Sequence, residues 1–193
     1  MRNLFAYAAL ALALPSLPLQ AADATHTPAP DALTPLIIKI KQRIDIGEEV
    51  ALSKWYSGKP VQDTDREKQV IVDATSKASE FGLGKDDVRQ FMTAQIEANK
   101  LVQYARLAQW HATGTAPEKS GQNLANNIRA RLDNLQPELL STYAAFVPYR
   151  KDVDCPTWVK NVTERQVTDP VVAIAMLRAA GELCTSSRKG NRS

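Results

Sequence analysis

The sequence has few of the residues that carry metal, covalent or nucleotide chemistry. Its 193 residues include two cysteines and two histidines, and the histidines, His26 and His111, are far apart in the chain. A zinc site needs more ligands than these residues supply. The chain also lacks a recognisable Cys/His or Ser/His catalytic arrangement and the G-x-G-x-x-G loop of dinucleotide-binding proteins. We therefore expect neither a metal nor a cofactor.

Basic clusters and strand-like patterns are scarce as well. The net charge is +3, and the one short basic stretch, from Arg188 to Arg192, gives little support to a nucleic-acid partner. No segment alternates apolar and polar residues as a half-buried strand does. The chain is long enough for one domain with a sizeable core, and its hydrophobic fraction of 44% is typical of globular proteins. These features predict a single all-α domain.

The longest apolar run lies at the N-terminus. Residues 4–19 follow the basic residue Arg2 and are interrupted by Pro15 and Pro18. A membrane span requires about 20 apolar residues, whereas a secretory signal has the shorter pattern seen here. We predict that residues 1–21 are a signal peptide, that the mature protein is periplasmic or secreted, and that it keeps no membrane anchor.

The rest of the chain divides into a domain and a tail. Residues 22–185 hold the helical patterns, and residues 186–193 form a basic tail that we expect to be flexible. Both cysteines, Cys155 and Cys184, lie in the C-terminal third. Since an exported chain meets an oxidising compartment, this even number of cysteines predicts one disulfide.

Apolar residues at helical spacing predict a bundle of about six helices. Asp63 or Thr64 is placed to cap the second helix, and Gly82 to end it. Pro137 is expected to bend the fourth. The expected helices cover residues 31 or 34 to 55, 63–81, 86–113, 122–146, 158–165 and 169–184.

Charged residues recur on the inward-capable faces of the first two predicted helices. Arg43 and Lys54 are eleven residues apart, and eleven steps of about 100° return to within roughly 20° of the same side. Asp63 and Arg66, three residues apart at the start of the second helix, are also neighbours on one face. Each residue alone is typical of a solvent-exposed surface, but a solvent-facing pattern has no reason to keep this register. The set therefore indicates a polar site.

The third predicted helix adds two amides, and with them the chain resembles a known family. Asn99 and Gln103 stand four residues apart and share a face. Together with the charged residues above, they fall at the spacing of the helical chorismate mutases, and the chain most closely resembles the exported, gamma-type branch of their AroQ class. The resemblance spans residues 36–184 and implies the type II helical fold. Its motifs are Val50-Ala51-x-x-Lys54-Trp55, Pro60-Val61-x-Asp63-x-x-Arg66-Glu67 and Gln95-Ile96-x-Ala98-x-x-x-Val102-Gln103.

This resemblance implies that the chain rearranges chorismate to prephenate in one pericyclic step, without nucleophile, metal or cofactor. The substrate is a dicarboxylate that must be held in a compact conformation while negative charge grows on the oxygen of the breaking ether bond. Guanidinium groups suit its carboxylates because they stay charged and can form two parallel hydrogen bonds. By matching positions, the expected substrate-binding residues are Arg43, Lys54, Asp63, Arg66, Glu67, Asn99, Gln103 and Arg129.

The resemblance assigns roles to seven of these eight residues, all except Asn99. Lys54 and Gln103 are expected to be catalytic and to donate hydrogen bonds to the ether oxygen. Arg43, Arg66 and Arg129 are expected to hold the carboxylates, with Arg129 supplied by the same chain. Glu67 and the start of the second helix around Asp63 are expected to bind the ring hydroxyl of the substrate.

Two residue assignments depart from the family pattern or stay open. Arg131 is an alternative to Arg129, which we prefer because an ungapped match runs on from it. Asn99 stands where the family commonly has Ser or Thr, so a hydroxyl contact becomes an amide contact. The resemblance also implies a homodimer. Two other functions stay open: a related lyase that releases pyruvate from isochorismate, and a non-catalytic exported binding module.

Overall fold

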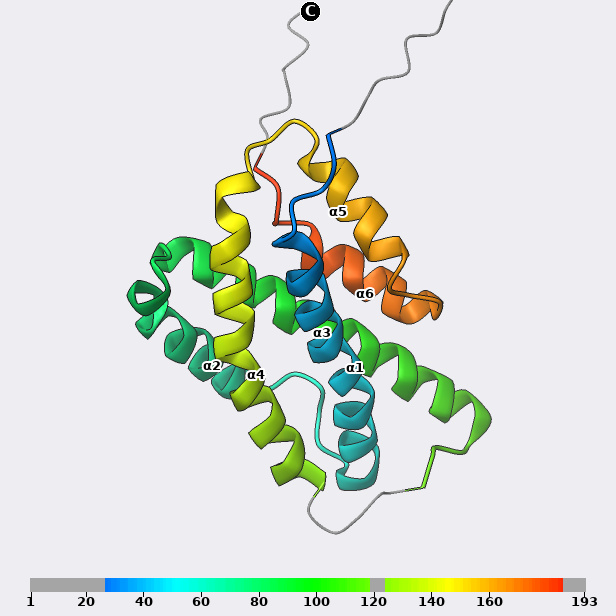
Figure 1. The fold of residues 1–193 in the computed structure, drawn as a ribbon. Helices are drawn as coiled ribbons and strands as arrows, with labels where there is room; N and C mark the ends of the chain where they lie inside the picture. The colour runs from blue at the N-terminus through cyan, green and yellow to red at the C-terminus, as the bar shows by residue number, and fades with distance from the viewer. Residues whose placement is uncertain (1–26, 119–123, 186–193) are drawn as a thin grey trace, which may run out of the picture.

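The computed structural model describes residues 27–118 and 124–185, which form an all-helical fold (Figure 1). The predicted all-α class with about six helices is confirmed. The predicted signal peptide (1–21) and tail (186–193) lie outside the described residues. The helices are α1 (Leu33–Ser57), α2 (Thr64–Ser76), α3 (Lys85–Thr113), α4 (Leu124–Phe146), α5 (Cys155–Glu164) and α6 (Pro170–Ala180), with short 3-10 helices η1 (Ala78–Phe81) and η2 (Val147–Tyr149).

Helix α1 runs through the middle of the molecule and contacts α3, α4, α5 and α6 (Figure 1). Its apolar residues recur at helical spacing, and Leu36, Ile37, Ile40 and Ile44 are completely buried. Around this helix, α3 and α4 pack along its length, while α2 rests against α3. A polar side chain on a buried face of α1 therefore needs either a partner or a cavity.

The start of α2 brings several of the polar residues into a fixed local geometry. Asp63 caps the helix, since its carboxylate accepts a hydrogen bond of 3.2 Å from the backbone N–H of Arg66. Glu67 Oε1 in turn accepts from the backbone N–H of Asp63 at 3.3 Å. The cap thus fixes where Arg66 and Glu67 leave the helix.

Two of the predicted helices end earlier than expected. The second was expected to continue to residue 81, but α2 ends at Ser76 and η1 follows it. At this end the backbone tightens, since the N–H of Lys77 bonds to the carbonyl of Ala74, three residues back, at 3.2 Å. The last helix was expected to reach residue 184, but α6 ends at Ala180.

The chain beyond α6 is held at the end of the molecule near α5. Cys184 forms a disulfide with Cys155 (S–S 2.03 Å), as predicted. Arg150 lies beside it and is 6% exposed. Its guanidinium donates to the carbonyls of Glu182 and Leu183, both at 3.0 Å, and to Asp87 at 2.8 Å. The C-terminal segment is therefore fixed by one covalent bond and a set of hydrogen bonds.

Candidate active site

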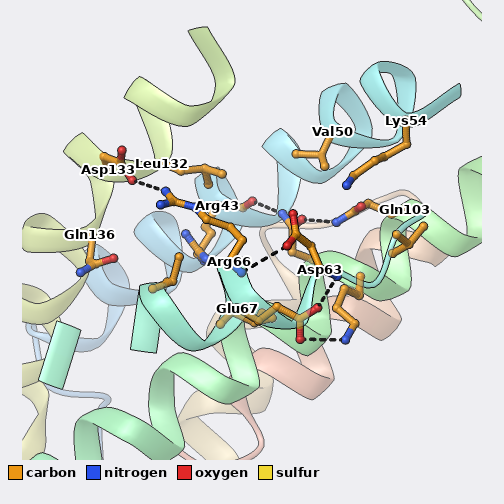
Figure 2. Close-up of a pocket in the computed structure, with 15 residues that line it drawn as sticks. Arg43, Val50, Lys54, Asp63, Arg66, Glu67, Gln103, Leu132, Asp133 and Gln136 are labelled. Carbon is orange, nitrogen blue, oxygen red and sulfur yellow. Dashed lines mark hydrogen bonds and ion pairs between the residues drawn. The ribbon is translucent and has the colours of Figure 1, made fainter. Parts of the chain in front are cut away.

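A pocket lies between α1, α2, α3 and α4, with an empty volume of about 670 Å³ that is partly open to solvent (Figure 2). It brings together seven of the eight predicted substrate-binding residues; only Arg129 is missing from its lining. The full lining consists of Arg43, Val50, Lys54, Val61, Asp63, Arg66, Glu67, Val70, Ile96, Asn99, Lys100, Gln103, Leu132, Asp133 and Gln136.

Arg43 supplies a buried cation from the middle of α1. The residue is 5% exposed, and its Nε is buried without a hydrogen-bond partner among the described residues. Burial, and secondarily the positive charge of Arg66, lower the pKa of Arg43 to about 10, while Asp133 opposes this shift. The guanidinium is still protonated at neutral pH. An unsatisfied buried donor of this kind is costly unless a ligand pairs with it.

Lys54 lies three turns further along α1 and lines the same pocket. In Figure 2 its ammonium reaches toward the edge of the pocket that holds Gln103, whereas Asp133 and Gln136 lie at the opposite edge. No ion pair joins Lys54 to a carboxylate in the described part of the chain. The ammonium is therefore available to a ligand.

Arg66 reaches from α2 across the pocket to α4. Its guanidinium pairs with Asp133 at 2.9 Å, and the two side chains are 35% and 55% exposed. An ion pair this open to water contributes less than about 1 kcal/mol. A ligand carboxylate can therefore compete with Asp133 for Arg66 at small cost.

Glu67 is held by a cation that sequence reasoning did not single out. Lys100, on α3, donates to Glu67 Oε2 at 3.0 Å, and both side chains are largely buried. Lys100 also reaches Gln62 at 3.3 Å. The Glu67 carboxylate is thus fixed both by the α2 cap and by α3, which makes it a rigid acceptor at the pocket wall.

The two amides of α3 form a chain that ends on α1. Gln103 Nε2 donates to Asn99 Oδ1 at 2.8 Å, and Asn99 Nδ2 donates to the backbone carbonyl of Arg43 at 2.8 Å. Both residues are buried, and Gln103 Oε1 is without a partner among the described residues. One of the two Gln103 amide hydrogens remains free for a ligand.

Arg129 lies on α4 in a cavity that adjoins the main pocket. It is exposed, and its neighbour Arg131 pairs instead with Glu49 of α1 at 2.6 Å. The structure therefore places Arg129, and not Arg131, next to the site. The residues that line both cavities are Val50, Lys54, Asp63, Arg66 and Leu132.

The charges around the pocket leave two cations unpaired. It is lined by four cations and three carboxylates. Asp133 pairs with Arg66, and Glu67 pairs with Lys100. Arg43 and Lys54 have no carboxylate partner among the residues described. Asp63, the third carboxylate, caps α2 and makes no ion pair in the described part of the chain, so the lining has a net charge of +1. The pocket is therefore suited to a small anionic ligand that pairs with Arg43 and Lys54.

Three polar lining residues, Lys100, Asp133 and Gln136, were missed by sequence reasoning. Asp133 and Gln136 stand four and seven residues after Arg129 and so share its face of α4. That spacing was the available signal. Lys100 directly follows Asn99, and only the packing of α3 on α2 brings it to Glu67.

Within residues 27–118 and 124–185, no group of three or more His, Cys, Asp or Glu side chains is arranged to hold a metal ion. None of the helices there has the length and hydrophobicity needed to cross a bilayer. The fold and the pocket together define an all-α protein with a polar, net positive cavity between four helices.

Comparison with known proteins identifies the family. The chorismate mutase type II family matches residues 35–104. A secreted chorismate mutase of Mycolicibacterium smegmatis is 30% identical over 165 residues, which cover 82% of this chain and 91% of that protein. The crystal structure of a chorismate mutase from Burkholderia phymatum superposes with a TM-score of 0.75 at 39% identity, covering 81% of this chain and 98% of that one.

A chorismate mutase structure from Burkholderia thailandensis gives a TM-score of 0.74 at 32% identity and covers 79% of this chain and 99% of that one. The chain belongs to the chorismate mutase type II family. It is an exported member, as relatives from three bacteria named secreted chorismate mutases indicate.

Proposed function

We propose that the protein is a chorismate mutase that rearranges chorismate to prephenate in the pocket between α1, α2, α3 and α4. The observation that carries this proposal is the convergence of Arg43, Lys54, Arg66 and Gln103 from three helices on one cavity. Family membership supports the same reaction. In this rearrangement one C–O bond breaks as one C–C bond forms within a single molecule, so no group or electron leaves the substrate.

The protein accelerates such a reaction by restraint and by electrostatics. Arg43 and Arg66 are proposed to bind carboxylates, with Arg129 closing the outer side of the site. Arg43 suits this role because its buried Nε has no other described partner. Arg66 suits it because its partner, Asp133, is half exposed and easily displaced.

Lys54 and Gln103 are proposed to stabilise the developing charge on the ether oxygen. Lys54 has no described carboxylate partner, and Gln103 keeps one amide hydrogen free, so both can donate without breaking an existing bond. A preorganised donor in a water-poor site is worth roughly 3–4 kcal/mol in the transition state. Glu67, held by Lys100 at 3.0 Å, is proposed to accept the ring hydroxyl, close to the α2 cap formed by Asp63.

The test is the loss of chorismate absorbance with the purified mature protein. Lys54→Ala is expected to lower kcat by about 10²- to 10³-fold. Lys41→Ala is the matched control, because Lys41 lies on the same helix, pairs with Asp45 at the surface and does not line the pocket. It is expected to keep full activity. A wild-type rate equal to the uncatalysed rate, with the helical fold intact by circular dichroism, would refute the proposal.

Product analysis separates this reaction from the lyase alternative. A mutase forms prephenate and no pyruvate, whereas a lyase releases pyruvate from isochorismate.

We also propose, on the resemblance alone, that the protein is a homodimer, which sedimentation velocity will test. The presence of Arg129 beside the pocket of its own chain supports a site that one chain completes.

A further inference from the structure

The side chain of Asn99 connects Gln103 to the backbone of α1. It is 7% exposed and makes two hydrogen bonds of 2.8 Å, one donated to the carbonyl of Arg43 and one accepted from Gln103 Nε2. Both ends of the Asn99 amide are thus engaged with the protein itself. Asn99 therefore lines the pocket but uses its amide for hydrogen bonds within the protein.

The direction of these hydrogen bonds is fixed by chemistry. A backbone carbonyl only accepts, so Asn99 must turn its NH₂ group to Arg43 and its oxygen to Gln103. Gln103 must then turn its own NH₂ group toward Asn99. If the Gln103 amide flipped, two oxygens would face each other and a buried hydrogen bond would be lost. Asn99 therefore selects one of two otherwise similar orientations of Gln103.

A glycine on α1 makes this arrangement possible. A Cβ at Gly47 would lie 3.0 Å from Asn99 Nδ2 and 3.2 Å from the backbone oxygen of Asn99. Gly47 stands one turn after Arg43, whose carbonyl Asn99 must reach. Its absent side chain allows α3 to approach α1 this closely.

We propose that Asn99 is a positioning residue that holds the Gln103 amide in the orientation presenting an N–H to the reacting ether oxygen. This rests on the proposed function. Asn99 then acts on the reaction through Gln103, and not through a contact with a substrate carboxylate. Its contribution belongs to kcat, because it affects a hydrogen bond that strengthens only in the transition state.

A double-mutant cycle tests this. Asn99→Ala is expected to lower kcat roughly 3- to 10-fold, the range of one hydrogen bond, with little change in KM. In a Gln103→Ala background the same substitution is expected to have no further effect on kcat, since the amide it orients is gone. Equal losses in the two backgrounds, or a loss confined to KM, would overturn the proposal. A wild-type protein without mutase activity would instead defeat the proposed function.

A pH profile gives a second readout that a purely structural residue would not move. In Gln103→Glu the carboxyl must be protonated to donate, so the rate is expected to fall as pH rises. The Asn99 oxygen facing this group disfavours its ionised form. Adding Asn99→Ala should therefore move the midpoint of the fall to lower pH, and an unmoved midpoint counts against the proposal.

If Asn99→Ala does not fold, Gly47→Ala makes the same test from α1. The added methyl group presses on the Asn99 amide, at 3.0 Å from Nδ2, and on the backbone oxygen of Asn99 at 3.2 Å, and Gly47 does not line the pocket. The expected kcat loss must again vanish in the Gln103→Ala background. A loss of equal size there would refute the role of Asn99.

Discussion

Two arginines are buried to almost the same degree in this protein, and their surroundings differ. Arg43, in the pocket, is 5% exposed and Arg150, near the disulfide, is 6% exposed. Three groups accept hydrogen bonds from Arg150, and its guanidinium carbon lies 5.4 Å from the ring centre of Tyr143. None of the described residues accepts a hydrogen bond from the Arg43 guanidinium, and Arg66 repels it.

The difference separates a structural charge from one kept for a ligand. A buried cation stabilises a fold only when its donors are paired, as those of Arg150 are. Arg43 carries a cost that the charge of Asp133 offsets only in part, and a bound anion would reduce it. We therefore expect the same substitution to have opposite effects in the two regions: a loss of activity at Arg43 and a loss of stability at Arg150.

The largest effect is expected for Arg43→Met. Removing one member of a buried charge pair with the substrate costs about 2–5 kcal/mol, so kcat/KM should fall on the order of 10²- to 10³-fold. Stability should hold or rise. The pKa of this base is lowered from 12.5 to about 10 by folding, so below pH 10 the folded state bears the full cost of the charge. Chorismate assays and urea unfolding check both results.

Arg150→Met should give the reverse. The substitution leaves the carbonyls of Glu182 and Leu183 without their donor and should lower the free energy of unfolding by about 3 kcal/mol. Because the residue is remote from the pocket, kcat should stay within about twofold of the wild type. Urea unfolding followed by circular dichroism measures the loss. If Arg43→Met lowered the free energy of unfolding as much as Arg150→Met, Arg43 would be a structural residue like Arg150.

Asp133→Asn sharpens the comparison within the pocket. Asp133 competes with a substrate carboxylate for Arg66, and the pair is half exposed. Its removal should lower KM by about two- to fivefold, corresponding to less than about 1 kcal/mol, without changing kcat. Steady-state kinetics at low ionic strength will show this effect most clearly. A rise in KM would mean that Asp133 orients Arg66.

The smallest effect is expected for Asp169→Asn, a control outside both regions. Asp169 caps α6 and accepts from Arg106 at 2.6 Å, and this hydrogen bond lowers the pKa of its carboxyl below 3.8. The stabilisation is present above pH 3.8 and disappears as pH falls through the lowered value. Asparagine keeps the cap, so the loss at pH 7 should stay under about 1 kcal/mol and vanish in acid. Thermal unfolding measured in steps from pH 7 down through the acid range follows both.

Much of the fold could be predicted because helical periodicity is local. The apolar residues of α1 and α3 recur at the spacing of one buried face, and the ends of both helices lie within two residues of the predictions. The predicted C-terminal ends of α2 and α6 were wrong. These ends depend on the tightened backbone turn at Lys77, whose N–H bonds to the carbonyl of Ala74, and on the turn that brings Cys184 to Cys155.

The set of site residues could be predicted, because most of them lie in motifs on α1, α2 and α3. The contacts that each residue makes could not be predicted. Asn99 was expected to bind the substrate; it lines the pocket, and the structure adds a hydrogen bond to the backbone of Arg43 that no motif indicated. Asp133, which is 67 residues from Arg66 in the chain, was not recognised at all.

The sequence by itself determined the helices, the pairing of two exported cysteines and the polar residues that share faces. These follow from periodicity and residue chemistry within one segment. Only the tertiary structure decided which cations are neutralised and which are left for a ligand. In the sequence Arg43 and Arg150 are equivalent guanidinium groups; they differ because helices far apart in the chain bring acceptors to Arg150 and leave a cavity beside Arg43.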